Sequence, residues 1–593
     1  MTTAIDSRIA AEVAAVRTHA GLWLRYTHAF VRFTGPDVAT WLQSQSTNDV
    51  LLLESGDGHA NALVDRKAHL IAHFTLHRWD DEYWCLIERS QYPAFYESLD
   101  AHLFVEQVEI HNAADEVDQV VIQGPRSLFF LSTILEADET ALSDVLPASP
   151  YGCHPLELLG HQTLAFRVSP TGEDGYVLLV PRGEGESLLD ALLARGESFQ
   201  ISAVSEGARE VLRVEAGIPL FGIDMDATNR LPETTLERDG VSFTKGCYLG
   251  QEVIAKLKTY GSVKRALMGL VLDGSAPSMG ATMLVDGKEI GEVRSACFSP
   301  TLQTVIALAY LDREYRAPDS SLTFETIPNR CTYRARVVVL PFVHALTREE
   351  HAHSLYTRAL EAFGDDTHDE SAVAIDLLRE AIALRPTFED AYECLGVILN
   401  RHHRVDEAIH FMKALAALNP SCIMAHTNLS VFYLAKGMID EAEIEKAQAA
   451  VLELKLARDA KKAEELAAEE RERIRREAMD RIRMFREVLE FDPEDPLATF
   501  GMGVAHMQLS EYEAAIPHLE QATRVQKDYS AAYLNLGKCH EFVGHAELAG
   551  DTYRRGIEVA NRKGDLMPMR EMERRLKSLA LAPVTTSPTT GSE

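Results

Sequence analysis

The most unusual short stretch of the sequence is Lys245-Gly246-Cys247-Tyr248-Leu249-Gly250-Gln251-Glu252. Its glycines mark a backbone that turns tightly or approaches another group closely. Lys245 stands two residues from Cys247, and its positive charge favours the thiolate form of a cysteine. A helix that begins at Leu249 would add to this effect. A lone cysteine is more often a small buried hydrophobe, but the surrounding residues make Cys247 a candidate functional thiol.

The sequence changes character near residue 345. Up to about Phe342, runs of β-branched residues end in turn signals such as Gly124-Pro125, which is typical of an α+β fold. Short strands separated by Asp-Gly and Ser-Pro turns predict a small β-barrel over residues 262–342. From Leu346 onward, Ala, Leu, Glu and Arg dominate at helical spacing, so this half is predicted to be all-α.

The helical half contains a repeat with a period of 34 residues. The residues that recur at this interval are Pro386, Ala391, Leu395 and Gly396 with Pro420, Ala425, Leu429 and Ser430, and Ala498 and Gly503 with Ala532 and Gly537. Small residues where paired helices touch, and a proline before each pair, indicate a helix-turn-helix solenoid. The units resemble tetratricopeptide repeats (TPR), and such repeats present a concave surface to protein partners.

A charged stretch interrupts the repeats. Between Glu441 and Glu490, acidic and basic residues alternate with few apolar ones. This pattern favours a long solvated helix with i,i+4 ion pairs over a partner-binding coiled coil. The predicted domains are 1–261 (α+β body), 262–342 (barrel), 343–440 (TPR-like), 441–490 (charged helix), 491–582 (TPR-like) and 583–593 (disordered tail).

Composition excludes several classes of function. The 593 residues carry a net charge of -31, so the whole molecule lacks the basic surface that nucleic-acid binding requires. The longest apolar run, around Val337 to Leu346, is too short to span a membrane. Asp6, Arg8 and Glu12 occupy the place of a signal-peptide core, so we expect a cytoplasmic protein. The eight cysteines form no CxxC pair, which argues against a disulfide scaffold or a metal site.

The Lys245–Glu252 stretch resembles the signature of YgfZ-type folate-binding proteins, which are relatives of the glycine-cleavage aminomethyltransferase (GcvT). Supporting matches are Trp41 to Val50, the Gly124-Pro125 turn and Arg213 to Asp226, and the resemblance covers about residues 20–342. It implies a multidomain protein with an α+β folate-binding body around a central hole, a C-terminal barrel and tetrahydrofolate as ligand. It also implies a role in assembling or repairing iron–sulfur enzymes.

The resemblance also suggests folate-binding residues. Glu215 stands where the aminomethyltransferases hold the pterin ring with a glutamate, and a carboxylate suits the amino-pyrimidine edge because it accepts two parallel hydrogen bonds. The alternative is an ordinary surface or helix-capping glutamate. Asn112 resembles an asparagine near the folate, and Tyr248 and Gln251 of the motif are predicted to complete the site. We expect the thiol of Cys247 to open onto the same cavity.

One departure from the aminomethyltransferases concerns their reaction. A paired Asp-Asp follows a Gly-Gly turn in that family, but here those places fall on Ala72 and His73, and Ala68 stands where glycine is usual. Removing a group that orients or accepts a proton typically costs about 100 to 10,000-fold in rate. The sequence therefore leans against an aminomethyl-transfer enzyme.

Three functions stay open at this point. The first is a tetrahydrofolate-binding accessory protein for iron–sulfur enzymes, in which Cys247 is the functional thiol and the repeats recruit the client enzyme or an assembly factor. The second is a folate-dependent one-carbon transferase with an unknown acceptor. The third is an interaction scaffold that carries a vestigial folate domain.

Overall fold

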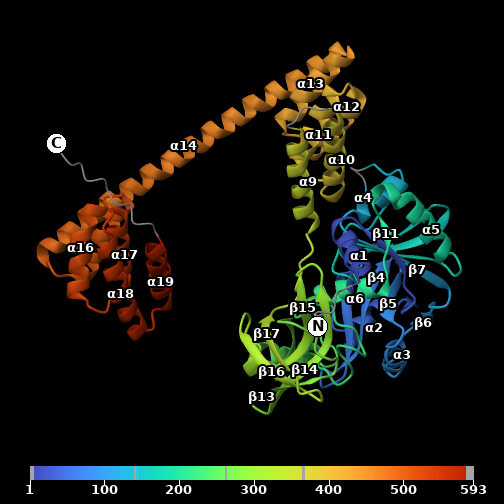
Figure 1. Ribbon diagram of the computed structural model, residues 1–593. Coiled ribbons are helices and arrows are strands. Elements are labelled where there is room, and N and C mark those ends of the chain that lie inside the picture. The colour runs from blue at the N-terminus through green and yellow to red at the C-terminus, as the bar shows by residue number, and fades with distance from the viewer. Residues whose placement is uncertain (1–5, 139–141, 143–144, 261–262, 364–367, 582–593) are drawn as a thin grey trace, which may run out of the picture. The chain divides into compact units, whose positions relative to one another are not determined.

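The computed structural model describes residues 6–138, 142, 145–260, 263–363 and 368–581 (Figure 1). The chain divides into two compact units, Met1–Gln448 and Ala449–Glu593, and each is described by itself. The first unit holds all the strands of the described residues and the helices up to the start of α14. The predicted tail, 583–593, lies outside the described residues.

Two β-sheets form the body of the first unit. The six-stranded sheet has the order β11-β1-β7-β10-β9-β8 and the five-stranded sheet the order β3-β4-β5-β2-β6. The strands of the first are β1 (Gly21–Leu24), β7 (Val117–Gln123), β8 (Cys153–Leu158), β9 (His161–Phe166), β10 (Gly175–Pro181) and β11 (Ser202–Ala203). The strands of the second are β2 (His28–Thr34), β3 (Gly58–Val64), β4 (Leu70–Trp79), β5 (Glu82–Glu88) and β6 (Glu109–Asn112).

The helices of the body cover the sheets. They are α1 (Ser7–Thr18), α2 (Val38–Gln45), α3 (Tyr92–Asp100), α4 (Ser127–Ile134), α5 (Gly185–Gly196), α6 (Glu206–Glu215), α7 (Glu237–Gly240) and α8 (Gln251–Tyr260). The central strands β7 and β10 are buried along almost their whole length because helices or strands pack on both faces, which explains their nearly continuous apolar runs.

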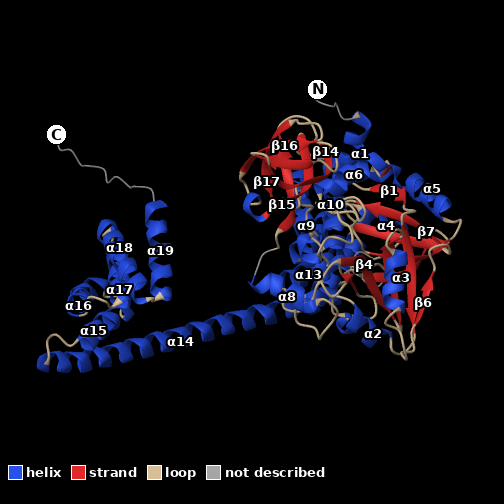
Figure 2. Ribbon diagram, turned by 90° about the horizontal axis from the view of Figure 1, so that it is seen from below, coloured by secondary structure: helices blue, strands red, loops and turns tan. Residues whose placement is uncertain are grey.

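A closed barrel follows the body. Its strand order is β12-β15-β14-β13-β16-β17, and Figure 2 shows it as a separate group of strands. The strands are β12 (Arg265–Leu272), β13 (Thr282–Val285), β14 (Lys288–Ser299), β15 (Thr304–Asp312), β16 (Ser321–Ile327) and β17 (Thr332–Val338). In β16 exposed and buried residues alternate, and Leu322 and Phe324 enter the barrel core, as the period of two in a strand requires. The fold class predicted from the sequence is confirmed.

The first block of helices packs against the body. It consists of α9 (Arg348–Phe363), α10 (His368–Leu384), α11 (Glu389–Arg401), α12 (Val405–Leu418) and α13 (Ile423–Lys436). The buried faces of these helices form one hydrophobic cluster with α4, α5 and the six-stranded sheet. An ion pair of 3.2 Å between Arg126 Nη2 and Glu380 Oε2 crosses the same contact. This block is therefore part of the folded first unit and not a free arm.

Helix α14 (Ile439–Phe491) runs through the charged stretch as one helix of 53 residues, and the division between the two units falls within it. Nearly all of its described side chains between residues 451 and 477 are exposed, as expected of a solvated helix.

The second unit continues with α15 (Pro496–Gln508), α16 (Tyr512–Val525), α17 (Ser530–Phe542), α18 (Ala546–Lys563) and α19 (Leu566–Leu581). Its small residues lie where helices cross. A Cβ added to Gly537 in α17 would stand 2.3 Å from a ring carbon of Tyr553 in α18, so only glycine fits there. Among the described residues, no helix is both long enough and apolar enough to span a membrane.

Candidate functional site

The body encloses a cavity of about 380 Å³. Its wall combines strand β4 with the loops around residues 150, 168–175, 216–219 and 235–239 and with the segment that leaves the barrel. The lining side chains and backbone come from Ala60, His73, Thr75, Pro150, Tyr151, Arg167, Val168, Ser169, Gly172, Asp174, Gly175, Ala216, Gly217, Ile218, Pro219, Thr235, Leu236, Arg238, Asp239, Leu340 and Pro341. The wall is mostly apolar and carries a few charged groups, which is the usual composition of a small-molecule site.

His73 is the titratable residue of β4 that lines the cavity. Because side chains alternate along a strand, His73 and Thr75 share the cavity face while Ala72 is buried on the other. The imidazole makes no hydrogen bond with another described residue, and burial lowers its pKa to about 4. The ring is therefore neutral at pH 7 and offers one donor and one acceptor to a ligand.

Arg167 and Asp174 form a charged corner of the same wall. Arg167 Nε donates to Asp174 Oδ1 over 2.8 Å, and Arg348 Nε from α9 donates to Asp174 Oδ2 over 2.6 Å. Burial alone would raise the pKa of Asp174, but the two guanidinium groups outweigh it and lower that pKa below its usual range. This carboxylate is thus a permanent anion that holds two cations.

Asp239 is the second carboxylate of the wall, and it forms no ion pair within the described part of the chain. It lies on the short helix α7, whose position is set by hydrogen bonds from Asn48 Nδ2 to the Asp239 carbonyl (3.0 Å) and from Thr47 Oγ1 to the Gly240 carbonyl (2.6 Å). Burial, with the nearby negative charge of Asp239, raises the pKa of Tyr151 to about 12. Asp239 is therefore an acceptor that stays available to a ligand.

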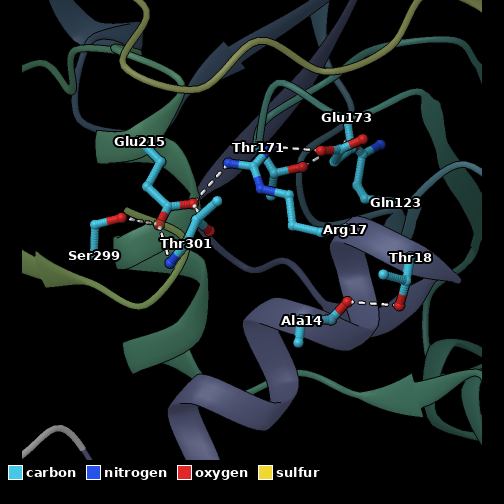
Figure 3. A network of polar contacts seen from close by, with 9 residues as sticks. All are labelled: Ala14, Arg17, Thr18, Gln123, Thr171, Glu173, Glu215, Ser299 and Thr301. Carbon is cyan, nitrogen blue, oxygen red and sulfur yellow. Dashed lines mark hydrogen bonds and ion pairs between the residues drawn. The ribbon is translucent and has the colours of Figure 1, made fainter. Parts of the chain in front are cut away.

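Glu215 lies outside this wall. Its carboxylate is completely buried and accepts hydrogen bonds from Arg17 Nη2 (2.8 Å), Ser299 Oγ (2.5 Å) and Thr301 Oγ1 (2.9 Å), while Arg17 also pairs with Glu173 (Figure 3). The network joins α1, α6 and the end of barrel strand β14. A pterin would have to displace one of these partners, so the predicted role of Glu215 in holding the ring stays a prediction.

The Lys245–Glu252 loop is hydrogen-bonded to the segment that follows α2. Lys245 Nζ donates to the carbonyl oxygens of Ser46 and Asn48, each over 2.7 Å, and burial lowers the pKa of this lysine to about 8. The structure thus brings together two sequence motifs nearly 200 residues apart. The lysine's ammonium is committed to these carbonyl groups.

Cys247 is exposed and is not among the residues that line the cavity, contrary to our expectation that its thiol opens onto it. Helix α8 begins at Gln251, so Cys247 lies in the loop and not in the helix's first turn. The loop carries the thiol on the outside of the body because the side chains on either side, Lys245 and Tyr248, are the ones that turn inward.

The other three predicted ligands also lie outside the cavity wall. Tyr248 is buried in a hydrophobic cluster with Leu70 and Ile254. Gln251 Nε2 donates to the Lys245 carbonyl over 3.5 Å. Asn112 ends β6, and its Oδ1 accepts from the Ala114 amide over 3.0 Å, which is the turn-forming role of an asparagine. Their roles as folate ligands stay predictions.

Sequence reasoning missed Tyr151, Arg167, Asp174 and Asp239. The sequence held a signal for Asp174 alone. A charged turn, Thr171-Gly-Glu173-Asp174-Gly175, leads into the buried strand β10. Charged residues beside a buried strand need partners or a ligand. The partners of Asp174 could not be found from local sequence because Arg348 lies 174 residues away.

Comparison with known proteins agrees with this architecture. The model of the GCVT N-terminal domain matches residues 2–243, that of the glycine cleavage T-protein C-terminal barrel domain matches 265–344, and a tetratricopeptide repeat model matches 500–562. An aminomethyltransferase of Shouchella clausii is 30% identical over 338 residues, which cover 57% of this chain and 90% of that protein. The chain belongs to the glycine cleavage T-protein (aminomethyltransferase) family.

Further similarities support the T-protein assignment. An aminomethyltransferase of Thermoanaerobacter pseudethanolicus is 27% identical over 309 residues, covering 52% of this chain and 82% of that protein. The crystal structure of aminomethyltransferase T from Bartonella henselae matches with a TM-score of 0.50 and 22% identity over 57% of this chain and 90% of that one, which shows the shared T-protein fold. The predicted kinship with GcvT is confirmed, and the narrower YgfZ-type assignment stays a prediction.

Proposed function

We propose that this protein binds a tetrahydrofolate in the cavity of its T-protein body and that its helical repeats bring a protein partner to it. The observation that carries the proposal is the cavity itself, whose volume of about 380 Å³ lies within the usual range of small-molecule sites, about 300 to 1,000 Å³. The relationship to aminomethyltransferases and the tetratricopeptide match support the two halves of the proposal. That the protein works in the cytoplasm remains a prediction from the sequence.

The residues of the wall fit a reduced pterin. Ala216, Ile218 and Leu340 supply apolar surface for the faces of a flat ring. The neutral imidazole of His73 and the carboxylate of Asp239 supply hydrogen-bonding groups that have no committed partner among the described residues. When bound, a tetrahydrofolate would supply the carrier nitrogens of one-carbon chemistry, and the chain's own residues would bind and orient it.

The chemistry beyond binding separates two candidates. In the first, which we favour, the protein is an accessory factor that supports assembly or repair of an iron–sulfur enzyme. Two observations favour it: His73, with a pKa of about 4, is a weak base where the relatives are expected to have a carboxylate, and Cys247 is exposed. One cysteine cannot hold a cluster that needs four protein ligands, so the thiol must act together with groups of the partner.

The second candidate is a folate-dependent one-carbon transferase. It is favoured by the carboxylate of Asp239, which lines the cavity without an ion pair in the described part of the chain and can accept a hydrogen bond from a ligand. In this case Asp239 takes the role that the residues at 72 and 73 have lost.

Calorimetric titration of the full chain with tetrahydrofolate tests the binding proposal. We expect saturable binding that is abolished by Ile218→Trp, which fills the cavity, and is kept by the matched control Ile223→Trp, at a partly exposed position outside the wall. No heat of binding with the folded wild-type chain would refute folate binding and leave the repeat scaffold as the function.

Two further measurements separate the candidates. Cys247→Ser should fail to complement a strain that lacks its YgfZ-type protein, whereas Cys331→Ser, which removes another exposed thiol, should complement it. Turnover of methylene- or aminomethyl-tetrahydrofolate by the wild type, lost in Asp239→Asn, would instead support the transferase. Complementation by Cys247→Ser would contradict the thiol's role.

A further inference from the structure

We propose that Arg348, the first residue of α9, is a positioning residue for Arg167 in the wall of the folate cavity, and that it acts through Asp174. This inference rests on the proposed folate binding for its functional meaning. It assigns a role in the ligand site to a residue outside the T-protein part of the chain.

The contacts form an unbroken chain. Arg348 Nε donates to Asp174 Oδ2 over 2.6 Å, and its Nη2 donates to Tyr176 OH over 2.8 Å. The other carboxylate oxygen, Asp174 Oδ1, accepts from Arg167 Nε over 2.8 Å. The side chains of Arg348, Asp174 and Arg167 are 14%, 18% and 15% exposed, so solvent screens these interactions weakly.

Asp174 separates two cavities. On one side lies the cavity proposed to bind folate, and on the other a cavity of about 280 Å³ lined by both α9 and the body. The lining of the second cavity includes Arg17, Glu173 and Asp174 of the body and Arg348, His351 and Arg358 of α9. A single acidic residue therefore faces the ligand site and is held from the helical block.

The placement of Asp174 depends on both cations. Its main chain is anchored at one point, where the Asp174 carbonyl accepts from the Gly124 amide over 2.8 Å. The carboxylate rotamer is set by the two guanidinium groups, which occupy one oxygen each. Without Arg348, the carboxylate keeps one partner and can rotate. Arg167, whose Nη1 still donates to the Ala148 carbonyl, then loses the fixed acceptor at its Nε.

Arg348 lies just outside the part of the chain that matches the T-protein domains, at the start of the helical region. The barrel-domain match ends at residue 344, four residues before Arg348, and Arg348 is the first residue of α9. Because α9 shares a hydrophobic cluster with the other helices of its block, a partner that shifts this block also shifts Arg348. Linkage then requires that folate binding alter the affinity for that partner by the same factor.

The test compares Arg348→Gln, Arg348→Lys and the control Arg358→Gln in the full chain. Arg358 lies on the same helix and lines the second cavity, but makes no ion pair within the described part of the chain. We expect tetrahydrofolate affinity to fall about tenfold at pH 7 in Arg348→Gln and to fall further toward pH 5, as Asp174 protonates with one cation missing. Arg348→Lys should recover part of the loss, and Arg358→Gln should stay within about twofold of the wild type.

Hydrogen exchange provides a readout that does not need the ligand. Amides of residues 167–175 should exchange faster in Arg348→Gln than in Arg358→Gln, and Asp174→Asn combined with Arg348→Gln should add little to either change alone. Unchanged exchange in Arg348→Gln overturns the inference whether or not folate binds. Faster exchange with no folate binding by the wild type would refute the proposed function and keep the positioning role of Arg348.

Discussion

Arg17 of α1 and Glu215 of α6 form an ion pair of 2.8 Å in which the carboxylate has no exposed surface. Glu215 also accepts hydrogen bonds from Ser299, the last residue of barrel strand β14, and from Thr301, which comes shortly after that strand. The pair therefore joins the N-terminal helix, the body and the barrel at one point.

Replacing Glu215 by Gln should destabilise the first unit. Removing one partner of a buried ion pair typically costs about 3 to 5 kcal/mol, and Arg17 keeps Glu173 as a partner, so we expect the lower end of that range. Urea unfolding of the full chain measures the change. Arg8→Met removes an exposed cation from the buried carboxylate of Glu12, which keeps its hydrogen bond from the Ser205 amide, so this change should cost less than about 1 kcal/mol. Normal stability of Glu215→Gln together with lost folate binding would instead show a ligand role.

Acid should destabilise the first unit between pH 6.5 and about 4. Burial is the main cause that lowers the pKa of His59, His73 and His351 to about 4 and that of His77 to about 3. The unfolded chain therefore binds more protons than the folded one in this window, so the free energy of unfolding is fully present above pH 6.5 and falls as pH drops.

Urea titrations at several pH values measure this slope. His351→Gln should reduce it by about one proton, or about 1.4 kcal/mol per pH unit, between pH 5 and 6. His403→Asn changes an exposed histidine in a left-handed backbone conformation that asparagine tolerates, and serves as the control. A slope that His351→Gln leaves unchanged would contradict the buried, neutral state of this ring.

Gly537→Ala should destabilise the second unit. The added methyl group would overlap the Tyr553 ring at 2.3 Å, and overpacking of this kind typically costs about 1 to 3 kcal/mol. In contrast, a Cβ at Gly550 of α18 meets the flexible end of Arg554 at 3.3 Å and Leu576 Cδ1 at 3.8 Å, an ordinary contact, so Gly550→Ala should be neutral or stabilise by up to about 1 kcal/mol. Thermal unfolding followed by circular dichroism compares the two variants, and equal effects would refute the tight contact.

Thiol labelling should distinguish the cysteines of the folded chain. Cys247 and Cys331 are exposed and should react rapidly with a disulfide reagent, whereas burial raises the pKa of Cys153 to about 12 and that of Cys539 to about 11. In Cys247→Ser one rapidly reacting thiol should disappear. If Cys247 reacted slowly in the native wild type and rapidly only after unfolding, the loop would have to cover this thiol.

The sequence predicted the architecture well because its patterns are local. The small residues Ala391 and Ala425 recur at an interval of 34 and both are completely buried in helices α11 and α13. In β16 the alternation of Leu322 and Phe324 with polar residues already identifies the face that enters the barrel. Periodicity reports which face of an element is buried, and that needs no knowledge of distant residues.

The candidate site was predicted less well because its geometry depends on distant pairings. The motif around Cys247 correctly pointed to a special loop, but the direction of its side chains follows from the bonds of Lys245 to Ser46 and Asn48. Only the tertiary structure placed Glu215 in a closed network, left His73 facing a cavity and set Arg348 against Asp174. Local sequence determines which residues must be buried or turned. The contacts that satisfy a buried charge are chosen among groups hundreds of residues apart, and no local periodicity encodes that choice.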